Sequence, residues 1–123
     1  MGVFTVAIGV GDPQGERFED VEAPVDTGAS YTAVPASLLR RLGVGVEGQR
    51  PFILADGRTV ERDVGQTRVR IDGKTLMTLV VFAGEGTRPL LGMVTLEEFG
   101  LGIDPVKQAL IPVPGYLMFL EGV

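Results

Sequence analysis

The chain has 123 residues, with no cysteine, no histidine and a formal net charge of −5 at pH 7. This length suits one domain, which we place over residues 1-123, and it allows about two thirds of the unfolded surface to be buried. Without histidine and cysteine the chain cannot build Ser-His or Cys-His nucleophiles or the usual zinc sites. The acidic charge argues against a nucleic-acid partner, which basic side chains would bind through its phosphates.

Hydrophobic residues make up 45% of the chain, and the mean hydropathy is +0.27. No apolar run approaches the ~20 residues of a membrane-spanning helix, so we expect no membrane partner. The surplus of apolar residues instead suggests a partner subunit. The first residues, Met1 to Phe4, lack the basic region and cleavage site of a secretion signal, so we expect a cytoplasmic protein.

Eighteen glycines and eight prolines separate short apolar runs, a pattern typical of a mainly β fold with tight turns. The first third predicts, in chain order, a strand from Val3 to Val10, a turn over Asp12 to Gly15, a strand from Phe18 to Val21, and a further strand that leads into Asp26.

A short helix is expected next. Pro35 can open it, because proline is tolerated in a first helical turn. Leu38, Leu39 and Leu42 then fall on one face, and Gly43 can cap the end.

Two hairpins follow, each centred on an Asp-Gly pair. Asp56-Gly57 and Asp72-Gly73 both lie between β-prone segments, and this pair is the strongest short-range signal for a type I′ turn. The remaining predicted elements are a mobile loop over Gly84 to Thr87, a helix from Met93 to Phe99 ended by Gly100, a turn at Asp104-Pro105, and strands over Lys107 to Ile111 and Tyr116 to Leu120.

The tripeptide Asp26-Thr27-Gly28 is the clearest indication of chemistry. It follows the apolar residues Ala23 and Val25, so the carboxylate is expected at the end of a buried strand, in a tight glycine turn. A carboxylate held rigidly there, among backbone N–H groups, is suited to acid-base catalysis. The alternative is an ordinary Asx-type turn after a strand.

Peptide hydrolysis needs both a base for the water and an acid for the scissile carbonyl. Two carboxyl groups about 3 Å apart provide both, because they share one proton at that distance. The chain carries a single Asp-Thr-Gly. The simplest source of the second carboxylate is therefore Asp26 of a second copy, which predicts a homodimer.

Three motifs, in this order, resemble those of the retroviral-type aspartic proteases, or retropepsins, and especially their small bacterial and archaeal relatives. The segment from Asp26 to Ser30 resembles the catalytic loop. Leu54-Ala55-Asp56-Gly57-Arg58 resembles the flap hairpin of the cellular members. Leu90-Leu91-Gly92 resembles the hydrophobic-hydrophobic-Gly element. The resemblance covers about residues 3 to 111 and implies a closed, mainly β barrel, one lobe per chain, with one or two short helices.

The resemblance also implies a role for each motif. A water would lie between two Asp26 carboxylates, one from each subunit, and Thr27 would reach across the two-fold axis. Gly28 would let backbone N–H groups approach the carboxylates, and Ala29 and Ser30 complete this loop. Ala55, Asp56 and Gly57 would close over an extended peptide substrate, and Leu90, Leu91 and Gly92 would pack beneath the loop. No cofactor or metal is implied.

Alternatives remain open at this point. Asp56 stands where viral flaps have a tip rich in glycine and isoleucine, and the Asp56-Gly57 pair is first of all a hairpin turn. The apolar segment Tyr116 to Leu120 could join a dimer sheet, although Pro112 and Pro114 lie close to it. The competing functions are a peptide-binding module that retains the fold without useful turnover, and a structural dimerisation domain.

Overall fold

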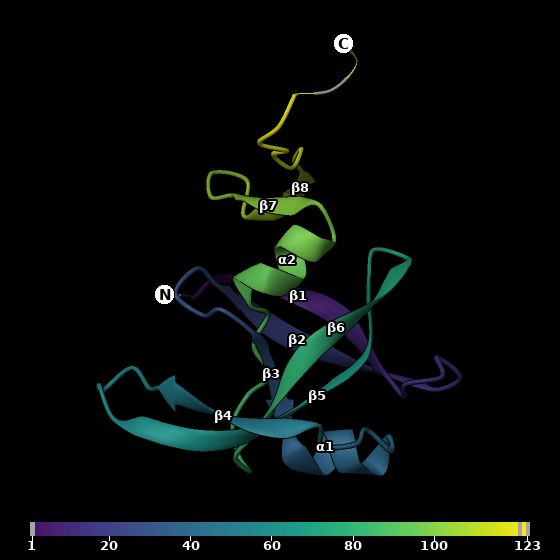
Figure 1. Cartoon of the computed structure of the whole chain (residues 1–123), viewed down its shortest axis with the longest axis vertical. Coiled ribbons are helices and arrows are strands. Elements are labelled where there is room, and N and C mark those ends of the chain that lie inside the picture. The colour runs from purple at the N-terminus through teal and green to yellow at the C-terminus, as the bar shows by residue number, and fades with distance from the viewer. Residues whose placement is uncertain (1, 121, 123) are drawn as a thin grey trace.

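The computed structural model describes residues 2–120 and 122 and confirms a mainly β fold with short helices (Figure 1). One sheet of six strands has the order β2-β1-β5-β6-β3, with β4 paired to β5, and a second sheet contains β7 and β8. The strands are β1 (Gly2–Gly11), β2 (Phe18–Asp26), β3 (Thr32–Pro35), β4 (Gly48–Ile53), β5 (Thr59–Ile71), β6 (Lys74–Ala83), β7 (Leu101–Asp104) and β8 (Ala109–Pro112). The helices are α1 (Ala36–Arg41) and α2 (Met93–Glu98).

The two strands predicted between residues 18 and 26 are one continuous strand, β2. It pairs antiparallel with β1 from Gly11↔Phe18 to Gly2↔Asp26. The acidic Asp20 and Glu22 do not interrupt the strand, because they alternate onto its exposed face while Ala23 and Val25 are fully buried. Asp26 is therefore the last residue of a long, well-supported strand.

The first predicted helix is confirmed. α1 begins after Pro35. Leu38, Leu39 and Leu42 are buried, and Gly43 follows with a φ of 77°. This left-handed conformation favours glycine and ends the helix. In the part of the chain that the structure describes, neither helix is long and apolar enough to span a bilayer.

Both predicted hairpins form, but their turns differ. Asp72 and Gly73 have φ values of 55° and 80°, which confirms the type I′ turn between β5 and β6. Between β4 and β5 only Gly57 has a positive φ, of 89°. The Asp56 carboxylate there accepts the backbone N–H of Arg58 at 3.0 Å. This Asx-type contact suits a residue with ordinary negative φ, so the type I′ prediction is wrong at this turn.

The expected closed barrel is not closed. β2 and β3 lie at the two ends of the strand order, and no ladder joins them among residues 2–120 and 122. The segment Leu90-Leu91 lies between them and forms one isolated bridge to each, Leu91 with Val25 and Leu90 with Ala33. A connecting segment, rather than a further strand, thus spans the gap in the sheet.

The C-terminal region departs most from the prediction. β7 was not predicted, and it pairs with β8 around a turn in which Asp104 accepts backbone hydrogen bonds from Val106 and Lys107. The predicted strand over Tyr116 to Leu120 is wrong for the single chain. This segment extends away from the body (Figure 1), and its side chains are between 61% and 90% exposed. A strand needs a neighbouring strand to hydrogen-bond, and none of the strands that the structure describes pairs with this segment.

The core lies between the six-stranded sheet and the elements that cover it. Its fully buried side chains come from both halves of the chain and include Ile8, Val10, Val25, Val34, Leu39, Val69, Val80, Leu91 and Leu96. The Leu91 side chain has 0% exposure and packs in this cluster. The bridge between β2 and β3 is therefore also a core position.

We predict that Leu91→Ala lowers the free energy of unfolding by about 2–5 kcal/mol, the usual cost of truncating a buried leucine. Denaturation in urea would measure the loss. Val106→Ala is the control, because Val106 is 91% exposed and its truncation should change stability by less than about 0.5 kcal/mol. Equal stability of the two variants would contradict this account of the core.

Candidate active site

Asp26 ends β2 at the start of a tight loop. Its backbone N–H donates to the Leu91 carbonyl at 3.3 Å. Its carboxylate accepts the backbone N–H of Gly28 at 2.8 Å, while its carbonyl accepts the N–H of Ala29 at 3.1 Å. Both the backbone and the side chain of Asp26 are thus held in place by main-chain hydrogen bonds.

Hydrogen bonds also set the charge of this group in the single chain. Hydrogen bonding to its carboxylate, in which the Gly28 backbone N–H takes part, holds the pKa of Asp26 below its ordinary value, and partial burial acts in the opposite direction. The Asp26 carboxyl is therefore ionised at neutral pH when a chain is alone.

The rest of the loop is anchored by helix α2. The Ala29 and Ser30 carbonyls accept the N–H groups of Met93 and Val94, at 3.0 and 2.9 Å. These donors open α2, which has no side-chain cap, so the loop supplies acceptors that the helix would otherwise lack. The contact fixes the second half of the loop and leaves its tip, Thr27 and Gly28, exposed.

Leu90-Leu91-Gly92 packs against both ends of the loop. Leu90 exchanges two backbone hydrogen bonds with Ala33, and the Leu91 N–H donates to the Pro24 carbonyl at 2.9 Å. A Cβ atom on Gly92 would lie 2.4 Å from the carbonyl carbon of Tyr31. Only glycine allows the two backbones to approach this closely.

A buried threonine cluster supports this element, and the sequence analysis missed it. The Thr32 hydroxyl accepts the Gly92 N–H at 3.1 Å and lies 2.6 Å from the Thr95 hydroxyl. Thr78 from β6 lies 3.1 Å from Thr95 and donates to Glu98. The cluster joins β3, β6 and α2 under the loop. Apolar periodicity does not reveal it, because threonine also occurs on ordinary strand surfaces.

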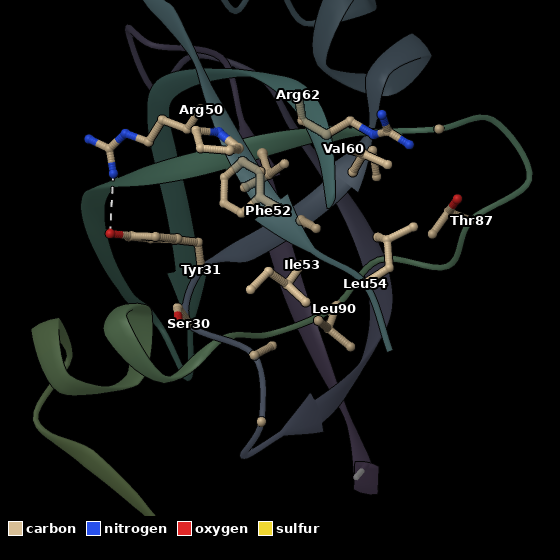
Figure 2. A pocket seen from close by; sticks show the side chains of 17 residues that line it. Ser30, Tyr31, Arg50, Phe52, Ile53, Leu54, Val60, Arg62, Thr87 and Leu90 are labelled. Carbon is tan, nitrogen blue, oxygen red and sulfur yellow. Dashed lines mark hydrogen bonds between the residues drawn. The ribbon is translucent and has the colours of Figure 1, made fainter. Parts of the chain in front are cut away.

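A cavity of about 730 Å³ opens beside the loop (Figure 2). One wall of the cavity is lined by the loop residues Gly28, Ala29 and Ser30. Further lining residues come from the β4–β5 hairpin, from β3 and β6, and from the segment between β6 and Leu90. Figure 2 shows Phe52, Ile53, Leu54, Val60 and Leu90 around its apolar part. Its volume and apolar lining are typical of a ligand site.

The predicted flap is the β4–β5 hairpin, but its tip does not line this cavity. Ala55, Asp56 and Gly57 are exposed at the turn, whereas the neighbouring Leu54 does line it. Asp56 faces its own hairpin, with Oδ2 2.7 Å from Nε of Arg58. Hydrogen bonds from the Arg58 backbone, then from its guanidinium, hold the pKa of Asp56 below its ordinary value.

Tyr31 is a second site residue that the sequence analysis missed, although it directly follows Ser30. Its ring lies edge-on to Phe52 of the hairpin, with ring centroids 6.2 Å apart. Its hydroxyl accepts a hydrogen bond from Arg50 at 3.2 Å, drawn as the dashed line in Figure 2. Tyr31 thus connects the Asp26 loop to the strand that covers the cavity.

The family model described as "gag-polyprotein putative aspartyl protease" matches residues 17–98 of the chain. This range contains the Asp26 loop, the β4–β5 hairpin and the Leu90-Leu91-Gly92 element, and it covers two thirds of the chain. The chain belongs to this family of aspartic proteases. The predicted recognition as a retropepsin-like protein is thereby confirmed at the level of the family.

Solved structures support the same fold. Similar chains include the Simian Foamy Virus (mac) protease, known from a solution structure, with a TM-score of 0.55 and 17% sequence identity. The match covers 77% of this chain and 93% of that chain. At this identity the likeness concerns the fold, which is that of the retropepsin-like proteases, one lobe per chain. No curated protein matches the sequence.

Among residues 2–120 and 122, no group of three or more Asp and Glu side chains is arranged so that it could hold a metal ion. The acidic residues Glu16, Glu19, Asp20 and Glu22 lie on an exposed or half-exposed surface.

We predict that Gly92→Ala lowers the unfolding free energy by about 1–3 kcal/mol, because the added methyl group would collide with the Tyr31 backbone. Hydrogen exchange should quicken at Tyr31 and Thr32 first, since their backbone must move. Gly48→Ala is the matched control, because its Cβ would meet nothing within 4 Å. Equal exchange rates in the two variants would refute the close-contact argument.

Proposed function

We propose that this family member is a homodimeric aspartic endopeptidase, acting in the cytoplasm on peptide or protein substrates. The observation that carries the proposal is the rigidly held Asp26 beside a peptide-sized apolar cavity, in a chain of the aspartic protease family. The hairpin over this cavity supplies an exposed strand, β4, along which an extended peptide can lie.

The need for a second chain follows from the site itself. The 17 residues that line the cavity include no aspartate or glutamate, so the wall beside Asp26 offers no second carboxylate. Thr27 and Gly28 at the tip of the loop are exposed in the single chain, where the same loop of a second copy can meet them. A two-fold axis through this tip would bring the two Asp26 side chains together.

In such a dyad the two carboxyl groups share one proton. The ionised Asp26 takes a proton from the bound water while the water oxygen attacks the scissile carbonyl carbon. The protonated Asp26 of the other subunit donates its proton to the carbonyl oxygen. The C–N bond then breaks as the amine leaving group gains a proton, and no covalent enzyme intermediate forms. The dyad titrates as a unit, so its two pKa values belong to the pair.

We predict that Asp26→Asn abolishes cleavage of an unfolded protein between pH 3 and 7. Wild-type activity should fall as the pH rises, because the shared proton is lost above the higher of the two dyad pKa values. That value is expected to lie above the pKa of Asp26 in the single chain, since like charges raise it. Gel assays with mass spectrometry of the fragments would measure both effects.

Asp72→Asn is the matched control for this substitution. Asp72 occupies the β5–β6 turn with a φ of 55°, a conformation that asparagine also adopts. Cleavage that persists in Asp26→Asn would eliminate the dyad mechanism. Binding of unfolded protein without cleavage by the wild type would favour a peptide-binding module.

We predict that specific activity falls on dilution below the dimer dissociation constant, because a separated chain holds only one of the two Asp26 carboxyl groups that the reaction requires. Thr27→Ala should raise this constant, since Thr27 is proposed to contact the partner loop. Analytical ultracentrifugation beside activity assays would test both statements, with Thr75→Ala in β6 as control. Undiminished activity in a verified monomer would refute the dimer proposal.

A further inference from the structure

The charge of the cavity differs from that of the whole molecule. The protein has a net charge of −5, yet the only charged residues among the 17 that line the cavity are two arginines, Arg50 and Arg62. A basic cavity in an acidic protein attracts anionic groups and disfavours cationic ones. The cavity is therefore electrostatically selective.

The strand register places these two arginines directly opposite each other. Arg50 of β4 pairs with Arg62 of β5, and two residues nearer the turn Phe52 pairs with Val60. Because side chains alternate along strands, all four lie on the face that lines the cavity. Like charges at directly opposed positions repel each other, so this pairing does not stabilise the empty hairpin.

Neither guanidinium is neutralised by a carboxylate within residues 2–120 and 122. The ion pairs there are Arg41–Glu19 and Arg58–Asp56. Arg50 instead donates to the Tyr31 hydroxyl, with its guanidinium carbon 5.5 Å from the Tyr31 ring centroid. Arg62 donates to the Glu61 carbonyl at 3.0 Å. These neutral contacts orient the guanidinium groups and leave their charge uncompensated.

Arg62 differs from Arg50 in one respect. It also borders a second, more open hollow whose charged lining, besides Arg62, consists of Arg40 and the three acidic residues Glu61, Asp63 and Glu85. The carboxylates outnumber the arginines there and reduce the positive potential on that side. Glu85 accepts hydrogen bonds from the backbone and hydroxyl of Ser37. Arg50 is therefore the stronger of the two anion sites.

The two arginines start from paired backbone positions, but their guanidinium groups point away from each other. Figure 2 shows the guanidinium groups of Arg50 and Arg62 pointing toward opposite sides of the cavity, with Phe52 in the middle and Val60 beside Arg62. Ile53 and Leu90 lie further along the cavity. An extended peptide in this cavity can bury an apolar side chain against the central residues while neighbouring side chains reach the guanidinium groups.

We propose that this cavity selects peptide segments in which an apolar residue is flanked by Asp or Glu, with Arg50 and, more weakly, Arg62 binding the flanking carboxylates. This inference rests on the proposed peptidase function and defines its substrate class. A guanidinium is suited to the task because its planar donors match a carboxylate.

The test uses short fluorescent peptides with a central Leu-Phe pair flanked on both sides by Glu, Gln or Lys. Binding is measured by anisotropy on Asp26→Asn, which keeps the cavity, and cleavage is measured on the wild type. We expect the Glu peptide to bind roughly five- to tenfold more tightly than the Gln peptide, and the Lys peptide to bind most weakly. The preference should shrink as salt is added.

Variants of the two arginines, made in both backgrounds, assign this preference to the cavity. Arg50→Gln should remove most of it, Arg50→Gln with Arg62→Gln should remove all of it, and Arg50→Glu should shift it toward the Lys peptide. Arg17→Gln is the control, because Arg17 is exposed and does not line the cavity. Circular dichroism and urea denaturation would verify that each variant is folded.

The outcomes separate this inference from the proposed function. Cleavage without a preference for the Glu peptide, or a preference that survives in the double variant, would overturn the inference and leave the peptidase proposal intact. An arginine-dependent preference in binding without any cleavage would support the inference and overturn the peptidase proposal. Absence of both binding and cleavage with all three peptides would overturn both.

Discussion

Backbone hydrogen bonds between the Leu90-Leu91 segment and two separate strands hold the candidate site together. Leu91 bonds to Pro24 and Asp26 at the end of β2, while Leu90 bonds to Ala33 in β3. The Asp26 loop runs between these strands, so the same segment fixes both ends of the loop. The proton sharing proposed for Asp26 requires such precision, because small displacements weaken proton transfer and substrate positioning. The buried threonine cluster and the start of α2 reinforce this arrangement.

Two sets of contacts hold the elements around the cavity in place. Main-chain contacts from α2 fix the wall formed by Ala29 and Ser30, whereas Tyr31 contacts the covering hairpin through Phe52 and Arg50. The hairpin tip is held mainly by its own local bonds, so the covering strand has fewer restraints than the loop. This division suits a site in which the reacting group stays rigid while the cover adjusts to an extended peptide.

Local patterns predicted the elements whose formation depends on neighbouring residues. α1 follows from Pro35, its leucine face and Gly43, and the β5–β6 turn follows from Asp72-Gly73. Prediction was weaker where distant contacts decide the outcome. The segment Tyr116 to Leu120 has strand-forming side chains but no neighbouring strand, and the barrel does not close because Leu90-Leu91 occupies the gap. The Asp56 turn differs from type I′ because its side chain bonds to Arg58.

The sequence by itself determined the chemistry available to this protein: without histidine or cysteine, a carboxylate in a strand-ending glycine turn was the principal reactive candidate, and three ordered motifs indicated its family. Only the tertiary structure decided which other residues surround it. Tyr31, Thr32, Arg50 and Arg62 carry no distinctive local signal, because their roles arise from strand register and from contacts between segments far apart in the chain. Side-chain type limits the possible reactions, but register and packing determine which groups meet.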